Sequence, residues 1–285
     1  MTRHVILVMA ALYVFSAATV FSQTKISETG KTGMSFLAIS PSSHITSLGS
    51  SATALNTGAS SIWSNPSLIA FQHERSAQFT HTEWIEGINQ EYAAISSPFS
   101  FGSMGLAVQL FDSGDIELRG NVPNSDPLGT YSIKNVSLGL TYARAITENI
   151  AAGLTYKKLF EKISDETAGG YAFDAGLLYN TPFKGISLAA SARNYGRMNK
   201  LKNDRTELPS DISFGGIYNG ILPGFGQSYS VLTDIVIPKY GDTGIRVGFE
   251  INPLEYMSLM LGYRSDSDIE DVSLGIGFSV DKYAA

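Results

Sequence analysis

Apolar and small or polar residues alternate one by one along most of the chain after residue 75. The clearest case is the stretch Asn135–Leu159, where apolar residues occupy every second position on both sides of the polar break Thr147-Glu148-Asn149. Successive side chains of a β-strand point to opposite faces, so each half of the stretch has one apolar face and one small or polar face. The short break predicts that the two halves form an antiparallel hairpin.

The same alternation predicts twelve strands, and a further hairpin within residues 30–70 would make fourteen. Several strands exceed the roughly five or six residues usual in soluble proteins and suit the roughly 9–11 residues that cross a bilayer at a tilt. The predicted strands are Ser76–Thr82, Ile88–Ser97, Ser103–Ile116, Tyr131–Ala145, Asn149–Glu161, Gly170–Asn180, Ile186–Tyr195, Asp211–Asn219, Gln227–Ile237, Thr243–Ile251, Met257–Arg264 and Val272–Val280.

The second face of these strands is rich in glycine and serine with an occasional charge, which favours apolar side chains facing lipid over a soluble sandwich. Short connections such as Pro98–Gly102 and Ile146–Glu148 alternate with longer ones such as Glu117–Thr130 and Gly196–Ser210. In outer-membrane barrels the short turns are periplasmic and the long loops external. The sequence therefore predicts an all-β, antiparallel transmembrane β-barrel of 12–14 strands, closed so that every backbone amide is paired.

The first residues have the pattern of an export signal. Thr2-Arg3-His4 is weakly basic, Val5–Val20 is mainly apolar, and Val20-Phe21-Ser22 suits cleavage before Gln23. A retained helical anchor is the alternative. We expect residues 1–22 to be a signal peptide for Sec-type export and the mature chain to lie in the outer membrane of a Gram-negative bacterium.

Residues 23–70 do not alternate cleanly, and small residues dominate them up to Trp63-Ser64-Asn65-Pro66-Ser67. Small side chains let the main chain pack closely against another element, and Asn-Pro favours a turn. We therefore expect residues 23–70 to form an irregular segment, a plug or a first hairpin, at or inside the periplasmic end. Residues 71–285 would form the barrel.

Composition excludes several classes of function. The net charge of −6 without a basic stripe argues against nucleic acid as a partner. The absence of cysteine excludes disulfides and thiol chemistry. His44, His73 and His81 have no metal-ligand spacing, and no nucleophile elbow is present. We expect no cofactor, no metal and no enzymatic activity.

Six segments, spread in order over most of the chain after residue 35, form a further pattern: Phe36-Leu37, Leu48-Gly49, Ala59–Pro66, Phe79–Trp84, Asp165–Gly176 and Gly185–Gly196. These segments resemble the PorV/PorQ outer-membrane proteins, which are similar to the FadL hydrocarbon transporters. Departures are Ser67-Leu68 after the Asn-Pro pair, Asn56-Thr57-Gly58 where an acidic pair is usual, and the ending Tyr283-Ala284-Ala285. The resemblance implies a FadL-like barrel of about fourteen strands, with Trp63, Asn65, Pro66 and Trp84 as motif residues. Trp63 and Trp84 could also anchor at the membrane interface.

Seven charges fall on the predicted inner face and have two interpretations. They could pair across a narrow interior, or they could contact the N-terminal segment or line a solute path. They are Lys157, Asp174, Arg193, Asp234, Arg246, Glu250 and Arg264.

Two functions remain open. The resemblance implies a non-enzymatic, partner-binding component associated with protein secretion of the type IX kind. Its partners would be secretion-system proteins or exported cargo, bound by the longer loops, with lipid around the barrel. The alternative is a FadL-like passive transporter of hydrophobic small molecules, which would need an apolar pocket lined by Leu, Phe and Met.

Overall fold

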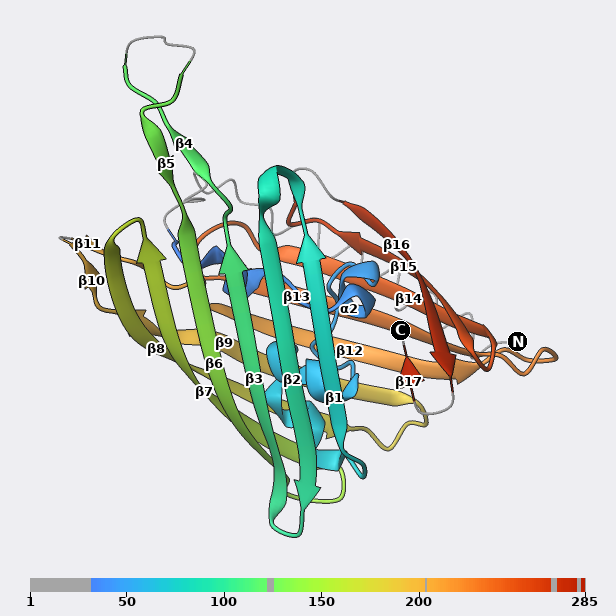
Figure 1. The fold of residues 1–285 in the computed structure, drawn as a ribbon. Helices are drawn as coiled ribbons and strands as arrows, with labels where there is room; N and C mark the ends of the chain where they lie inside the picture. Colours follow the sequence, from blue (N-terminus) through green and yellow to red (C-terminus); the bar gives the residue numbers. More distant parts are fainter. Residues whose placement is uncertain (1–31, 122–125, 203, 268–270, 281–282, 285) are drawn as a thin grey trace.

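The computed structural model describes residues 32–121, 126–202, 204–267, 271–280 and 283–284, so the predicted signal peptide lies outside the described residues. The described chain forms a curved antiparallel sheet of 13 strands, the last with only two residues (Figure 1). Its strands are β1 (Ser76–Glu83), β2 (Asn89–Phe99), β3 (Gly102–Asp112), β6 (Ile133–Ala145), β7 (Ile150–Ile163), β8 (Glu166–Asn180), β9 (Ile186–Met198), β12 (Asp211–Ile221), β13 (Ser228–Pro238), β14 (Gly244–Leu254), β15 (Met257–Arg264), β16 (Val272–Val280) and β17 (Tyr283–Ala284). The predicted strands all appear.

Apolar side chains point outward from this sheet. On β6, Leu138 and Leu140 are 43% and 47% exposed, whereas Ser137 and Thr141, which flank them and point to the other face, are buried. The other long strands repeat the pattern, with Leu154, Phe173, Leu177 and Ile276 exposed. A continuous apolar outer band of this kind is what a transmembrane barrel presents to lipid. The predicted direction of the two faces is therefore confirmed.

The connections define two ends of the barrel. One end, the short-turn rim, carries tight connections such as 100–101 and 255–256. The other end, the long-loop rim, carries the hairpin β4 (Ile116–Leu118) and β5 (Gly129–Tyr131), which projects beyond the sheet, and the hairpin β10 (Lys200–Leu201) and β11 (Asp204–Arg205) (Figure 1). On the same rim the connection between β7 and β8 is only Ser164–Asp165, because these strands stay paired up to Ile163 and Glu166.

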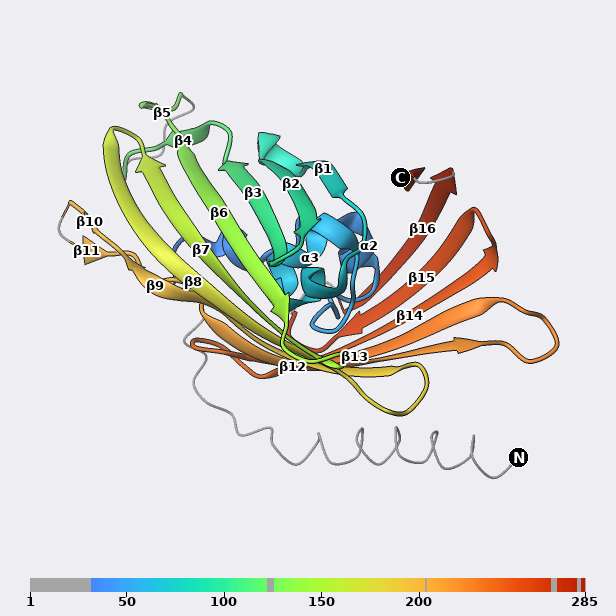
Figure 2. The same cartoon turned by 90° about the horizontal axis from the view of Figure 1, so that it is seen from below.

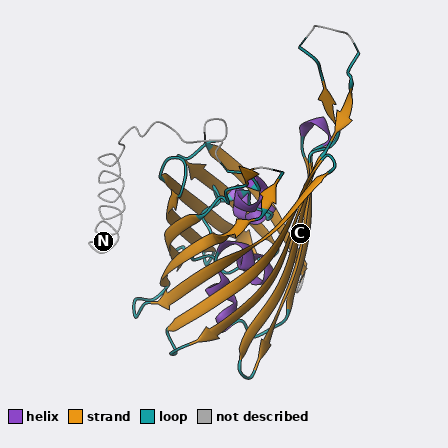
Figure 3. Ribbon diagram, turned by 90° about the vertical axis from the view of Figure 1, so that its left-hand side faces the viewer, coloured by secondary structure: helices purple, strands orange, loops and turns teal. Residues whose placement is uncertain are grey.

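The N-terminal segment fills the interior of the barrel (Figure 3). Thr32 bridges to Glu207 near the long-loop rim, and the chain then descends to the short-turn rim before entering β1. We term residues 32–71 the plug. Its helical turns are η1 (Ser35–Ala38), α2 (Ser43–Ser47), η2 (Gly58–Ser60), α3 (Ser61–Ser64) and η3 (Pro66–Phe71). An irregular segment at or inside the periplasmic end was expected, and the segment runs through the interior from one rim to the other. Helical turns replace the hairpin considered for residues 30–70.

The plug supplies about half of the residues of the hydrophobic core. Ile45, Leu48, Ile62, Leu68 and Ile69 are at most 2% exposed and pack against the inner wall. A second cluster at the long-loop end joins Met34, Phe36 and Leu37 of the plug to wall residues Leu159 and Met198. Burial of apolar surface is the main favourable term in packing. The core of this protein therefore lies between plug and wall rather than between two sheets.

Glycines of the inner wall mark where the plug backbone comes closest. A Cβ atom on Gly153 would lie 2.5 Å from the carbonyl carbon of Pro66 and from the nitrogen of Ser67. A Cβ atom on Gly176 would overlap the side chain of Asn65, and one on Gly262 would overlap the nitrogen of Gly49. Only glycine allows such an approach. The glycine-rich inner face predicted from sequence is therefore a docking surface for the plug.

The sheet is not closed in the part of the chain that the structure describes. The outer edges of β1 and β16 are not paired with each other and stand apart, whereas a closed sheet was expected (Figure 2). We term this gap the seam. The plug lies behind it and contacts both edges: the nitrogen of Ala59 donates to Ser76 Oγ at 3.0 Å, and the nitrogen of Gly49 donates to Ser273 Oγ at 3.1 Å. The plug therefore bridges the two strands that would otherwise meet.

We expect the seam to be the least protected part of the sheet. Apart from Ser279 and Val280, which pair with β17, the residues of β1 and β16 that face the gap have no strand partner among the described residues. Their backbone amides should therefore open without global unfolding. In detergent, hydrogen exchange at these amides should finish within minutes, while amides shared by β7 and β8 remain protected for hours. Equal protection of all four strands would show that β1 and β16 pair directly in solution.

Candidate functional site at the plug–wall interface

Asn65 stands at the centre of the plug corner and is fully buried. Its Nδ2 donates to the backbone oxygen of Thr53 at 2.9 Å and to that of Leu177 at 3.3 Å. Its Oδ1 accepts from the nitrogen and the hydroxyl of Ser67, at 3.0 and 2.7 Å, and so caps η3, which begins at Pro66. An Asn cap followed by proline at the first helical position is a strong helix start. The Asn-Pro pair therefore fixes the corner and ties it to the wall.

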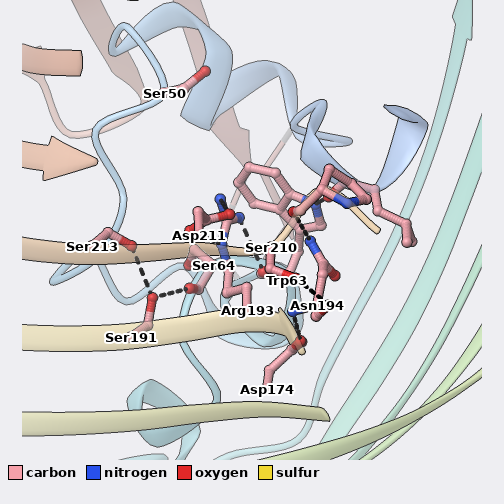
Figure 4. A network of polar contacts seen from close by, with 12 residues as sticks. Ser50, Trp63, Ser64, Asp174, Ser191, Arg193, Asn194, Ser210, Asp211 and Ser213 are labelled. Atoms are coloured by element: carbon pink, nitrogen blue, oxygen red, sulfur yellow. Dashed lines mark hydrogen bonds and ion pairs between the residues drawn. The ribbon is translucent and has the colours of Figure 1, made fainter. Parts of the chain in front are cut away.

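Arg193 of β9 joins the corner to the wall through Trp63 and Asp211 (Figure 4). Its guanidinium lies 4.4 Å from the centre of the Trp63 ring and makes two bonds to the Asp211 carboxylate, at 2.9 and 3.1 Å. Trp63 Nε1 donates to the backbone oxygen of Leu37 at 3.1 Å. Both members of the ion pair are about 5% exposed. Bidentate pairing and ring stacking are the two geometries for which arginine is best suited.

Lys157 and Asp174 form a second buried pair, within the wall. Lys157 Nζ lies 2.7 Å from Asp174 Oδ2 and donates to Asn194 Oδ1 at 2.8 Å. Asp174 also accepts from the backbone nitrogen of Asn194 at 2.7 Å (Figure 4). Asn194 has a φ of +59° at the irregularity where β8 and β9 shift register, a conformation that asparagine tolerates better than most residues. The pair thereby stabilises a bulge of the wall.

Asp234 of β13 binds the plug backbone. Its Oδ2 accepts from the nitrogens of Ala52 and Thr53 at 2.7 and 2.9 Å, and from the Thr53 hydroxyl at 2.8 Å. These three bonds anchor the middle of the plug to β13, two strands from Arg193 on β9.

Arg246 and Arg264 converge on Asp266 near the long-loop rim. Arg246 contacts Asp266 Oδ2 at 2.5 Å, Arg264 contacts Oδ1 at 3.2 Å, and Arg246 also donates to the backbone oxygen of Ser50 at 3.4 Å. Glu250, nearer the short-turn rim, accepts from His44 Nε2 at 3.0 Å. Both groups again connect a wall strand to the plug.

The stability of this rim should depend on pH through Asp266. Burial alone would raise the pKa of Asp266, but the hydrogen bond and charge of Arg246, with the charge of Arg264, outweigh it and hold the pKa below its usual value. A depressed carboxyl pKa stabilises the fold above the unfolded-state value near 4, and that stabilisation is lost as the pH falls through the folded-state value. Asp266→Asn should cost about 1–3 kcal/mol of unfolding free energy at pH 7.

Chemical denaturation of both proteins at pH 7 and at pH 2.5 measures this effect. The difference between wild type and Asp266→Asn should shrink in acid, because the wild-type carboxyl becomes neutral as well. Asp126, in the connection between β4 and β5, offers the control substitution Asp126→Asn, which should leave stability unchanged at both pH values. A difference that persists in acid would show that Asp266 acts through packing rather than charge.

The structure thus brings the predicted inner-face charges to the interior but not to one centre. Arg193, Asp234, Arg246 and Glu250 contact the plug, whereas the remaining three pair within the wall or rim. Trp63 is 4% exposed, so the prediction that it could anchor at the membrane interface is wrong. Trp84 lies apart from the corner, at the β1–β2 connection, with its ring 6.5 Å from that of Phe111.

The partners of these charges were missed by sequence reasoning. They are Asp211, Asp266, Asn194 and His44. The strand period offered a signal for Asp211, which shares the inner face with Ser213. No such signal exists for Asp266, which lies in a connection, or for His44, which lies in the plug.

The described residues contain no group of three or more His, Cys, Asp or Glu side chains that could hold a metal ion. No helix in the described ranges is long and apolar enough to span a membrane.

A pocket of about 430 Å³ lies inside the short-turn rim, between plug and wall. Both sides are mixed: the plug side has Leu55, Leu68 and Phe71 with His44 and Asn56, and the wall side has Asn180, Asn219 and Asn252 with Leu178 and Ile217. A second space, of about 20 Å³, lies beside Ile62 and Tyr92 and is about the size of one water molecule. Neither of these two spaces is an apolar chamber lined by Leu, Phe and Met.

Comparison with solved structures supports the fold. The chain is similar to the Pseudomonas putida toluene transporter TodX, a FadL-like protein, with a TM-score of 0.58 and 11% identity over 84% of this chain and 88% of that one. The KdgM porin, solved with disordered oligogalacturonate, gives a TM-score of 0.35 at 10% identity over 73% of this chain and 97% of that one, which is too weak to carry an argument. No protein-family model and no curated protein matches the sequence. The FadL-like barrel fold is thus confirmed, and membership of the PorV/PorQ family stays a prediction.

Proposed function

We propose that this protein is a non-enzymatic outer-membrane barrel that binds a protein partner at its long-loop rim and does not conduct solutes through its lumen. The observation that carries this proposal is the plug, which occupies the interior from one rim to the other. Four wall charges attach it through its backbone or side chains. Buried polar networks of this kind make an interior rigid, so we expect the plug to stay in place.

The apolar outer band supports placement in an outer membrane, with the short-turn rim facing the periplasm. Residues 1–22 would act as the signal peptide, residues 23–70 as the N-terminal segment and residues 71–285 as the barrel.

The projecting β4–β5 hairpin is the best candidate for partner contact. Leu118 and Leu128 are 51% and 71% exposed on it, beside an ion pair between Glu117 and Arg119 at 2.7 Å. Exposed aliphatic side chains on an element that extends beyond the membrane favour a protein interface. The PorV/PorQ resemblance favours a secretion-system protein or exported cargo, as in type IX secretion, as the partner.

A FadL-like passive transporter of hydrophobic molecules is the second candidate. The seam between β1 and β16 favours it, because a gap in the wall would let an apolar molecule pass between lipid and interior without crossing the polar rims. The mixed polarity of the lumen argues against this candidate.

Affinity purification from native membranes, combined with uptake measurements, tests the proposal. Full-length protein should retain a partner in mild detergent, and Leu118→Asp with Leu128→Asp should release it. Phe225→Asp, an equally exposed apolar position on the opposite rim, is the control and should retain it. Liposomes carrying the protein should take up toluene no faster than empty ones. Repeated recovery of the barrel alone, together with saturable uptake, would favour the transporter.

A further inference from the structure

The pocket inside the short-turn rim contains a belt of side-chain amides and hydroxyls from adjacent strands: Asn180 and Ser187 on β8 and β9, and Asn219 and Ser230 on β12 and β13. Beneath this belt the lining is mainly apolar, with the partly exposed Phe71 of the plug and the largely buried Leu178 and Ile217 of the wall. Asn219 is exposed, so the pocket opens toward the rim.

The amides are held in place but only partly used. Ser187 donates to Asn180 Oδ1 at 2.8 Å, and Ser230 donates to Asn219 Oδ1 at 2.7 Å. The Nδ2 groups of both asparagines have no acceptor among the described residues. Asn252 Nδ2 donates to Ser228 Oγ at 3.0 Å, and Asn252 Oδ1 accepts no hydrogen bond from a described residue. Each carboxamide can donate two hydrogen bonds and accept two. The wall therefore presents positioned donors and an acceptor to an incoming ligand.

The charge of the lining excludes several ligand classes. It contains no lysine or arginine to bind an anion, and its one carboxylate, Glu250, is already engaged by His44 at 3.0 Å. A hydrocarbon would cover the amides without replacing the hydrogen bonds they make to water, which is costly. A volume of about 430 Å³ lies within the range of about 300–1,000 Å³ typical of small-molecule sites. An uncharged, hydroxyl-rich ligand fits each of these conditions.

We propose that this pocket binds a neutral saccharide from the side of the short-turn rim, with ring hydroxyls on the amide belt and the C–H face on Phe71. The sidedness rests on the proposed function, in which this rim is periplasmic. The pocket and the β4–β5 hairpin lie at opposite ends of the barrel, so either assignment can fail without the other.

Calorimetric titration of the full chain in detergent with triacetylchitotriose and maltotriose tests the proposal. At least one of these neutral oligosaccharides should bind saturably with a Kd of about 1 mM or tighter. Asn219→Ala combined with Asn252→Ala should weaken binding about tenfold or more, because ligand hydroxyls lose a donor and an acceptor. Asn149→Ala, on the same rim but outside the pocket lining, should not change it. Partner recovery through the hairpin should be the same in all of these proteins.

A second measurement avoids the question of whether the double variant folds. In an otherwise unsubstituted chain, Ser187→Cys provides a single thiol in the pocket, and the bound saccharide should slow its reaction with a maleimide. No saturable binding of either saccharide, or equal binding by the double variant, would overturn the proposal. Displacement of the saccharide by a neutral tripeptide or by toluene at lower concentration would also overturn it, by showing that the pocket prefers another class of ligand.

Discussion

Replacing Arg193 by methionine is expected to lower the free energy of unfolding by about 3–5 kcal/mol, the usual cost of removing one partner of a buried ion pair. The Asp211 carboxylate would remain buried but would lose the guanidinium with which it is paired. The stacking contact with Trp63, at 4.4 Å, would also be lost, and the corner of the plug would lose its attachment to β9. Guanidinium titration of the detergent-solubilised barrel, followed by tryptophan fluorescence, measures the change.

Two further variants separate charge from geometry at this site. Arg197→Met, four residues along the same strand, removes an exposed guanidinium that contacts Tyr171, and it should cost little. Arg193→Lys keeps the charge but cannot make two parallel bonds to the carboxylate, so its stability should lie between wild type and Arg193→Met. If Arg193→Met is as stable as Arg197→Met, the plug is not held by this pair.

Gly153→Ala should displace the plug, although the substitution adds a single methyl group. The new Cβ would lie 2.5 Å from backbone atoms of Pro66 and Ser67, which cannot rotate away as a flexible side chain could. Overpacking of this kind costs about 1–3 kcal/mol or more where backbone must shift. Because the chain has no cysteine, Ser67→Cys provides a unique reporter. That buried thiol should be unreactive toward a polar maleimide in the parent and should react readily in Gly153→Ala.

Gly139→Ala is the matched control. It lies on the adjacent strand β6, also on the inner face, but its Cβ would meet side-chain atoms of Thr155 and Ala107 at 3.5 and 3.8 Å. Those are ordinary van der Waals distances, so the plug and the reporter should be undisturbed. Similar labelling rates for the two variants would mean that the plug does not press on the wall at Gly153.

The strands could be predicted from sequence because their signal is local. Alternation in stretches such as Val272–Val280 depends only on whether each side chain meets lipid or the interior. The Asn65–Pro66 corner was also recognisable, since an Asn cap and a proline act within three residues.

What could not be predicted depends on contacts between residues distant in the chain. Gly153 and Gly262 suggested a narrow lumen, whereas their role is to admit the backbone of residues far earlier in the chain. Asp266 gave no periodic signal because it lies outside the strands, and its partners come from β14 and β15. The unpaired edges of β1 and β16 were likewise hidden, because each strand alternates regularly whether or not its neighbour is present.

The position of the plug ahead of β1 constrains the order in which the molecule can assemble. If the sheet curved first, residues 32–71 would have to be threaded through the whole length of the barrel, past the loops at its rim. The segment emerges first during synthesis, and the later strands can instead be laid around it, with the glycine positions fitting to its backbone one after another. The first part of the chain would then act as the template for the curvature of everything that follows.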